Sequence, residues 1–129
     1  MRLLLDTHAL LWWWKDDPRL SKRAAAAIAD EANTVLVSAA SAWEIATKHR
    51  IGKLPGVENA LSGFNELIIT ADGFRHLAVA HNHAIKAGGF EAERRDPFDR
   101  MLAAQAIIEG AVLVSDDAAM KLFRVKCFW

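Results

Sequence analysis

The chain has 129 residues, of which 53% are hydrophobic, and its 16 basic residues balance 16 acidic ones for a formal net charge of +0. This length and apolar content suit one core, so we expect a single domain over residues 1–129. The balanced charge excludes binding of nucleic acid by bulk positive charge, the single cysteine excludes an internal disulfide, and no apolar run is long enough to span a membrane.

The chain starts directly with strand-like sequence. This start indicates that no signal peptide precedes the domain. A single cysteine also suits a reducing compartment, so the sequence predicts a cytoplasmic protein with no membrane partner.

Short apolar runs alternate with longer stretches that begin near a capping residue. The runs are typical of buried strands and the stretches of helices, so we predict an α/β protein with a three-layer α/β/α fold and a central, mostly parallel sheet. In the first half we predict a strand over residues 2–5, helices over 7–14 and 22–31, a strand over 34–37, and helices over 42–51 and 57–67. A turn at Asp72-Gly73 then leads to a strand over 75–79 and a helix over 81–87 that is closed by Gly88 and Gly89. The last predicted elements are a helix over 98–109 preceded by Pro97, a strand over 111–114, a short helix over 117–122 and a strand over 124–128.

Small polar residues mark the predicted starts of the first three helices. Thr7 is the predicted cap of the first helix and Ser21 of the second. Ser38 or Ser41 caps the third, and Ser41 with Glu44 three residues later fits the spacing of a capping box.

Four acidic residues stand at the ends of these elements. Asp6 follows the first strand, Asp117 follows the strand over 111–114, and Glu44 and Asp99 lie where helices begin. Each acid alone is also explained as a turn residue or a first-turn acid of a helix. The winding of an open α/β sheet, however, would bring all four together at the carboxyl ends of the strands. A pocket of carboxylates repels itself and calls for a hard divalent cation such as Mg²⁺.

The residues alone leave three kinds of function open. The first is metal-dependent phosphate chemistry, as in a nuclease. The second is a phosphoaspartate protein, although no acid ends the strand over 34–37 as a receiver domain requires, and Asp6-Thr7-His8 lacks the Asp-x-Asp of a haloacid-dehalogenase phosphatase. The third is a non-enzymatic binding module whose acids only cap helices.

Four segments resemble the motifs of a known family, the PIN domains of the VapC toxin type. The segment MRLLLDTHALLW at the N-terminus resembles the opening of such a domain, and SAASAWEIATK from residue 38 resembles its second acidic motif. The segment RDPFDRMLAAQA from residue 95 resembles the third and most specific motif, and LVSDD from residue 113 resembles the fourth. The motifs stand in the family's order and cover essentially the whole chain.

The resemblance implies a PIN-like fold and a Mg²⁺-dependent endoribonuclease, with Mn²⁺ as the alternative ion. It implies the toxin of a toxin–antitoxin pair, with an RNA substrate, a cognate antitoxin and a homodimer as partners. The implied catalytic and metal-binding residues are Asp6, Glu44, Asp99 and Asp117. Asp6 and Asp99 would be the closest ligands, while Glu44 and Asp117 would orient the attacking water or a second ion.

The chain departs from the family's pattern in two places. Ser115 stands where the family usually has threonine, and the spacing from it favours Asp117 over Asp116 as the inward acid. Before the third motif, Gly88-Gly89 and Arg94 replace the Leu-Pro and histidine that relatives often carry. Asp96 is a further acid in this region, with a supporting or RNA-facing role.

Two other groups of residues are candidates for contacts with partners. Successive side chains on a helix turn by about 100°, so Trp12, Trp13 and Trp14 cannot all face one core. We therefore predict that at least one tryptophan is exposed in the monomer. We expect it to lie in an interface, either with a second copy or with an antitoxin. The basic residues that are candidates to face RNA, with Arg100 foremost, are Lys48, His49, Arg50, Lys53, Arg94, Arg95 and Arg100.

Overall fold

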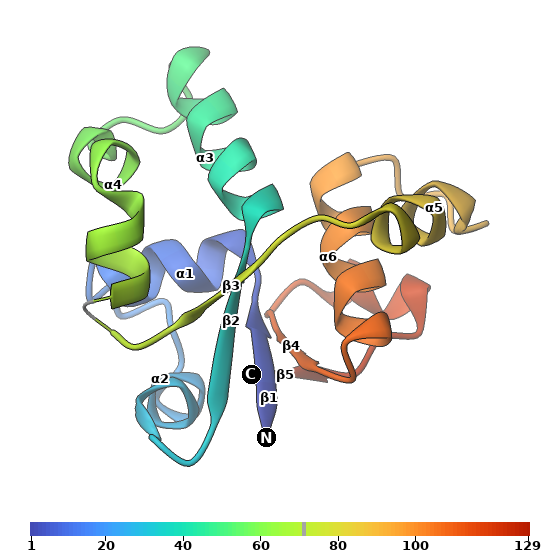
Figure 1. The fold of residues 1–129 in the computed structure, drawn as a ribbon, viewed down its shortest axis with the longest axis horizontal. Coiled ribbons are helices and arrows are strands. Elements are labelled where there is room, and N and C mark those ends of the chain that lie inside the picture. The colour runs from blue at the N-terminus through green and yellow to red at the C-terminus, as the bar shows by residue number, and fades with distance from the viewer. Residues whose placement is uncertain (71) are drawn as a thin grey trace.

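In the part of the chain that the structure describes, five strands form one sheet in the order β3-β2-β1-β4-β5, and every neighbouring pair is parallel (Figure 1). The computed structural model describes residues 1–70 and 72–129, except for the side chains of residues 67–69. The predicted α/β class with a central parallel sheet is therefore confirmed. The strands are β1 (Arg2–Leu5), β2 (Thr34–Ser38), β3 (Arg75–Leu77), β4 (Val112–Val114) and β5 (Cys127–Phe128).

The helices lie where the sequence predicts them, with two differences. The helix predicted over residues 57–67 is divided near Gly63 into α4 and the π-helical segment η1. The helix predicted to close before Gly88 and Gly89 includes both glycines. The helical elements are α1 (Thr7–Trp14), α2 (Lys22–Ala29), α3 (Ala39–Arg50), α4 (Glu58–Ser62), η1 (Asn65–Thr70), α5 (His81–Gly89), α6 (Pro97–Ile108) and the 3₁₀ segment η2 (Ala118–Phe123).

One predicted helix cap is wrong, and for another the structure selects one of the two predicted residues. Asp6, not Thr7, caps α1, because its Oδ1 accepts a hydrogen bond from the Ala9 amide at 2.7 Å. Ser38 caps α3, so Ser41 lies inside this helix and the predicted capping box with Glu44 does not form. In both places the helix starts as soon as the strand has ended, so the residue at the junction becomes the cap. The cap at Ser21 is confirmed.

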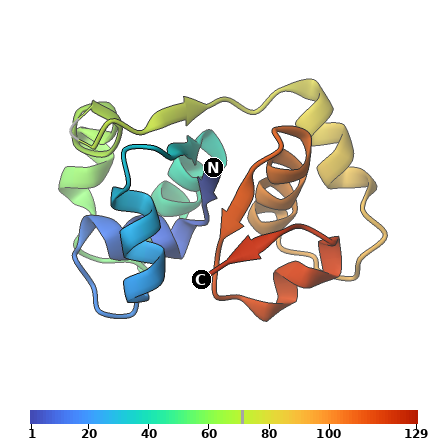
Figure 2. The same ribbon diagram turned by 90° about the horizontal axis from the view of Figure 1, so that it is seen from below.

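The sheet carries an apolar cluster on each face. Leu3 and Leu5 of β1 point to one face, where they pack with α1 and α2, and Leu4 points to the other, where it packs with α6 and η2. Figure 2 shows the two groups of helices on opposite sides of the strands. This alternation along β1 gives three layers, with the sheet between two layers of helices. The two helical layers meet at the carboxyl ends of the strands.

The three consecutive tryptophans are all half-buried, which contradicts the prediction that at least one is exposed. Trp12, Trp13 and Trp14 pack around the edge of the first apolar cluster. Trp129 and Phe74 reach them from other parts of the chain, with ring centroids 5.7 Å from Trp12 and 6.0 Å from Trp13 respectively. Packing partners on several sides of α1 therefore accommodate side chains that one flat core could not.

Within the described residues, every helix is too short or too polar to cross a membrane.

Candidate active site

Asp6 is held at the junction of the two central strands. Its amide donates to the Val114 carbonyl at 3.1 Å, which joins the ends of β1 and β4. Its side chain is only 8% exposed. Burial raises the pKa of Asp6 from 3.8 to about 6, although the Ser115 hydroxyl and the Ala9 amide favour the ionised form. A carboxylate in such a place is charged only at some cost and is stabilised by a nearby cation.

Glu44 lies one and a half turns into α3 and is buried, with 5% of its surface exposed. The Thr7 hydroxyl donates to Glu44 Oε1 at 2.6 Å and lies 3.1 Å from the Ser41 hydroxyl. The Lys48 ammonium, one turn further along the helix, forms an ion pair with Glu44 Oε2. Each carboxylate oxygen thus has its own partner, which fixes the orientation of the side chain.

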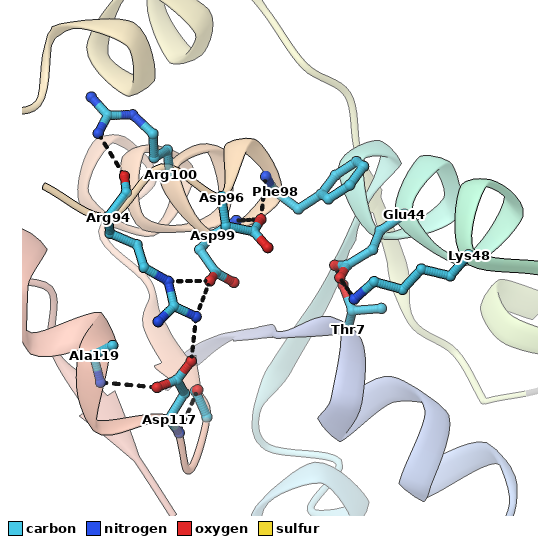
Figure 3. Close-up of polar contacts among 11 residues, drawn as sticks. Thr7, Glu44, Lys48, Arg94, Asp96, Phe98, Asp99, Arg100, Asp117 and Ala119 are labelled. Atoms are coloured by element: carbon cyan, nitrogen blue, oxygen red, sulfur yellow. Dashed lines mark hydrogen bonds and ion pairs between the residues drawn. The ribbon is translucent and has the colours of Figure 1, made fainter. Parts of the chain in front are cut away.

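Arg94 joins the remaining two predicted acids (Figure 3). Its Nε and Nη2 donate to Asp99 Oδ2 at 2.9 and 2.6 Å, and Nη2 also donates to Asp117 Oδ2 at 2.9 Å. The other oxygen of Asp117 accepts from the Ala119 amide at 2.9 Å, as the cap of η2. Burial raises the pKa of Asp99, and Arg94 acts in the opposite direction. One guanidinium therefore bridges carboxylates from α6 and from the loop after β4.

The four predicted acids line one small pocket of about 130 Å³ at the carboxyl ends of the strands. Five acidic side chains line this pocket, against one lysine and one arginine, so acidic groups are in excess. Asp116 is exposed and does not line it, which agrees with the choice of Asp117 from its spacing to Ser115. The lining residues are Asp6, Thr7, His8, Glu44, Lys48, Arg94, Asp96, Asp99 and Asp117.

The donor atoms of the pocket fit a hard divalent cation. They are carboxylate oxygens, which Mg²⁺ prefers, and their excess negative charge favours a cation. Among the residues that the structure describes, no three acidic, histidine or cysteine side chains are grouped to hold one ion. This arrangement is compatible with Mg²⁺, because that ion keeps several waters and takes only one or two direct carboxylates.

Asp96 has the supporting one of its two predicted roles, whereas Arg100 has a structural role. Asp96 caps α6, since its Oδ1 accepts from the amides of Phe98 and Asp99 at 2.9 and 3.1 Å. The guanidinium of Arg100 is turned away from the acids and donates only to backbone carbonyls, so the prediction that it foremost faces RNA is not supported. Its acceptors are the carbonyls of Ala87, Gly88, Phe90, Ala92 and Arg94, at 2.6 to 3.4 Å. Arg100 therefore organises the loop that carries Arg94.

The structure adds Thr7, Lys48 and Arg94 to the acids as residues that shape the pocket. The pairing of Lys48 with Glu44 has a sequence signal, because oppositely charged side chains four residues apart meet on a helix. Thr7 was assigned to a helix cap, a role for which its residue type is equally suited. Arg94 has no local signal, since its two partners lie 5 and 23 residues away in the chain.

Comparisons with known proteins agree with this fold. The sequence model of the family described as "PIN domain" matches residues 3–126. Ribonuclease VapC16 of Mycobacterium tuberculosis is 41% identical over 70 residues, which are 51% of this chain and 49% of that protein. The match thus spans about half the length of this curated relative.

Solved structures share the fold over nearly the full length. VapBC2 from Rickettsia felis bound to a promoter DNA fragment has a chain with a TM-score of 0.71 and 18% identity, covering 99% of this chain and 98% of that one. FitAcB from Neisseria gonorrhoeae gives 0.66 and 20%, covering 98% and 96%. VapBC-1 from nontypeable Haemophilus influenzae gives 0.65 and 13%, covering 99% and 97%. At such identities the likeness concerns the fold alone.

Proposed function

The chain belongs to the PIN domain family, and from this premise we propose that it is a metal-dependent endoribonuclease and the toxin of a toxin–antitoxin pair. One observation carries the proposal: acids from four distant segments, at residues 6, 44, 99 and 117, line one pocket that holds more carboxylates than cations. The relative named a ribonuclease supports RNA as the substrate. The phosphoaspartate alternatives lose their support, because they belong to other families.

We propose Mg²⁺, with Mn²⁺ as the alternative, as the ion of this pocket. A bound divalent ion would polarise the scissile phosphate and lower the pKa of a water molecule. Asp6 and Asp99 are the proposed direct ligands. Asp6 is buried and its pKa is raised, so its carboxylate gains most from a positive neighbour. Glu44 is held by Thr7 and Lys48, and Asp117 by the Ala119 amide, which suits both for orienting water.

The proposed partners are a cognate antitoxin and a second copy of the chain, in the cytoplasm where RNA is available. The solved structures with the same fold include complexes named VapBC and FitAcB, which supports a protein partner. A hollow of about 640 Å³ beside α1 is lined by Trp12, Trp13 and Trp14 and offers apolar surface for such a contact.

Cleavage of total cellular RNA by the purified protein tests the proposal. We expect new 5′ ends to appear with Mg²⁺ and to disappear with EDTA. Asp117→Asn should lower the cleavage rate by at least about tenfold. Asp116→Asn is the matched control, because this neighbouring acid is exposed outside the pocket. Cleavage that is indifferent to EDTA, or equal loss in both variants, would contradict the proposed site. Full activity of Asp117→Asn would instead favour the alternative in which the acids only cap helices and take no part in catalysis.

A further inference from the structure

We infer that Arg94 is shared between the proposed metal ligands and the RNA. Without a divalent ion its guanidinium neutralises Asp99 and Asp117, and when the ion enters, the guanidinium is displaced and binds a phosphate of the RNA strand. This inference rests on the proposed function and assigns Arg94 a role in both metal affinity and substrate binding.

Arg94 occupies carboxylate oxygens of the proposed metal site, one of the proposed direct ligand Asp99 and one of Asp117, which would orient water. Asp99 Oδ2 accepts two N–H groups of the guanidinium, at 2.9 and 2.6 Å, and Asp117 Oδ2 accepts a third contact at 2.9 Å. A Mg²⁺ ion needs its oxygen ligands at about 2.0–2.1 Å. Arg94 binds Asp99 through Oδ2, so an ion on either oxygen of this carboxylate would have a positive group beside it or would compete for the same atom. Ion and guanidinium therefore compete for these two carboxylates.

Lys48, the second cation of the pocket, does not raise the same conflict. It pairs with Glu44 within one helix, and the other oxygen of Glu44 accepts from Thr7. Arg94, in contrast, bridges two separate elements, α6 and the loop after β4. Removing this bridge frees two carboxylates at once, so Arg94 is the group whose position decides whether an ion can enter.

The surrounding loop lets the side chain move while its backbone stays fixed. The Arg94 carbonyl accepts from Arg100 Nη1 at 2.9 Å, which ties the backbone to α6. The side chain itself is 33% exposed. Figure 3 shows the Arg94 side chain extending from its loop to Asp99 and Asp117. A long side chain anchored in this way can swing from the carboxylates to the mouth of the pocket. At the mouth a guanidinium meets the strand that approaches the acids, and its planar fork binds phosphate well.

The inference predicts opposite effects on ion and nucleic acid for one substitution. Arg94→Ala should bind Mn²⁺ about tenfold more tightly than wild type, measured by titration calorimetry without RNA. The same variant should bind a labelled single-stranded DNA oligonucleotide more weakly in saturating Ca²⁺. The slope of its logarithmic affinity against logarithmic salt concentration should be smaller by about 0.7, the loss of one phosphate contact. Arg95→Ala, at the exposed neighbouring residue, should leave Mn²⁺ affinity unchanged.

A measurement on the unaltered protein avoids any folding defect of the variants. The NMR signal of the Arg94 side-chain Nε–H should shift when Mg²⁺ is added, whereas that of Arg100, which donates to the Ala87 carbonyl at 2.8 Å, should not. Mn²⁺ binding that is equal in wild type and Arg94→Ala, or weaker in the variant, overturns the inference and leaves the metal site intact. An unmoved Arg94 signal in the ion-bound protein, or an unchanged salt slope, also overturns it. If no divalent ion binds to any of the proteins, the proposed metal dependence fails as well.

Discussion

Replacing Asp6 with asparagine should stabilise the protein in the absence of metal. Asparagine has the same shape and is an equally good helix cap, so the hydrogen bond from the Ala9 amide is kept. The charge is lost, together with the carboxylate oxygen that accepts from the Ser115 hydroxyl. Because burial holds the pKa of Asp6 at about 6 rather than 3.8, the folded protein binds this proton more strongly than the unfolded chain does.

The sign and size of the effect follow from this difference. Below about pH 4 Asp6 is protonated in both states and adds no cost. As the pH rises from about 4 to 6, the unfolded chain has released the proton while the folded protein still holds it, so the free energy of unfolding falls. Above pH 6 the full cost is present. The interval from 3.8 to about 6, at about 1.4 kcal/mol per pH unit, amounts to about 3 kcal/mol.

Urea unfolding in EDTA at several pH values measures this cost. Asp6→Asn should be more stable than wild type by up to about 3 kcal/mol at pH 8 and equal to it at pH 4. Glu31→Gln, at an exposed acid of the loop after α2, is the control and should show no such trend. A variant that is less stable than wild type at pH 8, or a difference that does not change with pH, would refute the assignment of Asp6 as a buried carboxylate held at a cost.

Three further predictions concern residues that support the pocket. Thr7→Val removes the donor to Glu44 Oε1 and should lower the free energy of unfolding by about 1–3 kcal/mol in urea, with Thr7→Ser close to wild type. Arg100→Lys cannot reach five carbonyls, so hydrogen exchange measured by mass spectrometry should speed up over residues 87–94 and stay slow in the middle of α6. Ser38→Ala loses the cap bond to the Ala40 amide and the hydrogen bond that the hydroxyl donates to the buried Gln105 Oε1, and should cost about 1–3 kcal/mol in thermal or urea unfolding, whereas the same change at exposed Ser62 should cost less.

The sequence predicts the strands and the four acids because both depend on strong local patterns. Apolar runs such as residues 2–5 form buried strands in this setting, and an acid directly after such a run lies at the end of the sheet. The choice between neighbouring caps is different. Asp6 and Thr7 are both good caps, and the tertiary contact of Thr7 with Glu44 decides between them.

The sequence does not predict the roles of the arginines, for a related reason. Arg94, Arg95 and Arg100 stand in one charged stretch and look alike there. Their functions diverge only because the loop before α6 folds around Arg100 and directs Arg94 toward Asp99 and Asp117. Such a loop path depends on many weak contacts at once and has no periodic pattern that would reveal it.

The central position of β1 makes the acidic pocket depend on a long-range pairing. β1 pairs on one side with β2 and on the other with β4, which follows it in the chain by about a hundred residues. Until β4 docks, β1 has an open edge and Asp117 has no fixed place beside Asp6. The acidic pocket therefore forms only after the segment that carries β4 has been synthesised and has docked against β1, and the proposed nuclease activity would be absent from a polypeptide without that segment.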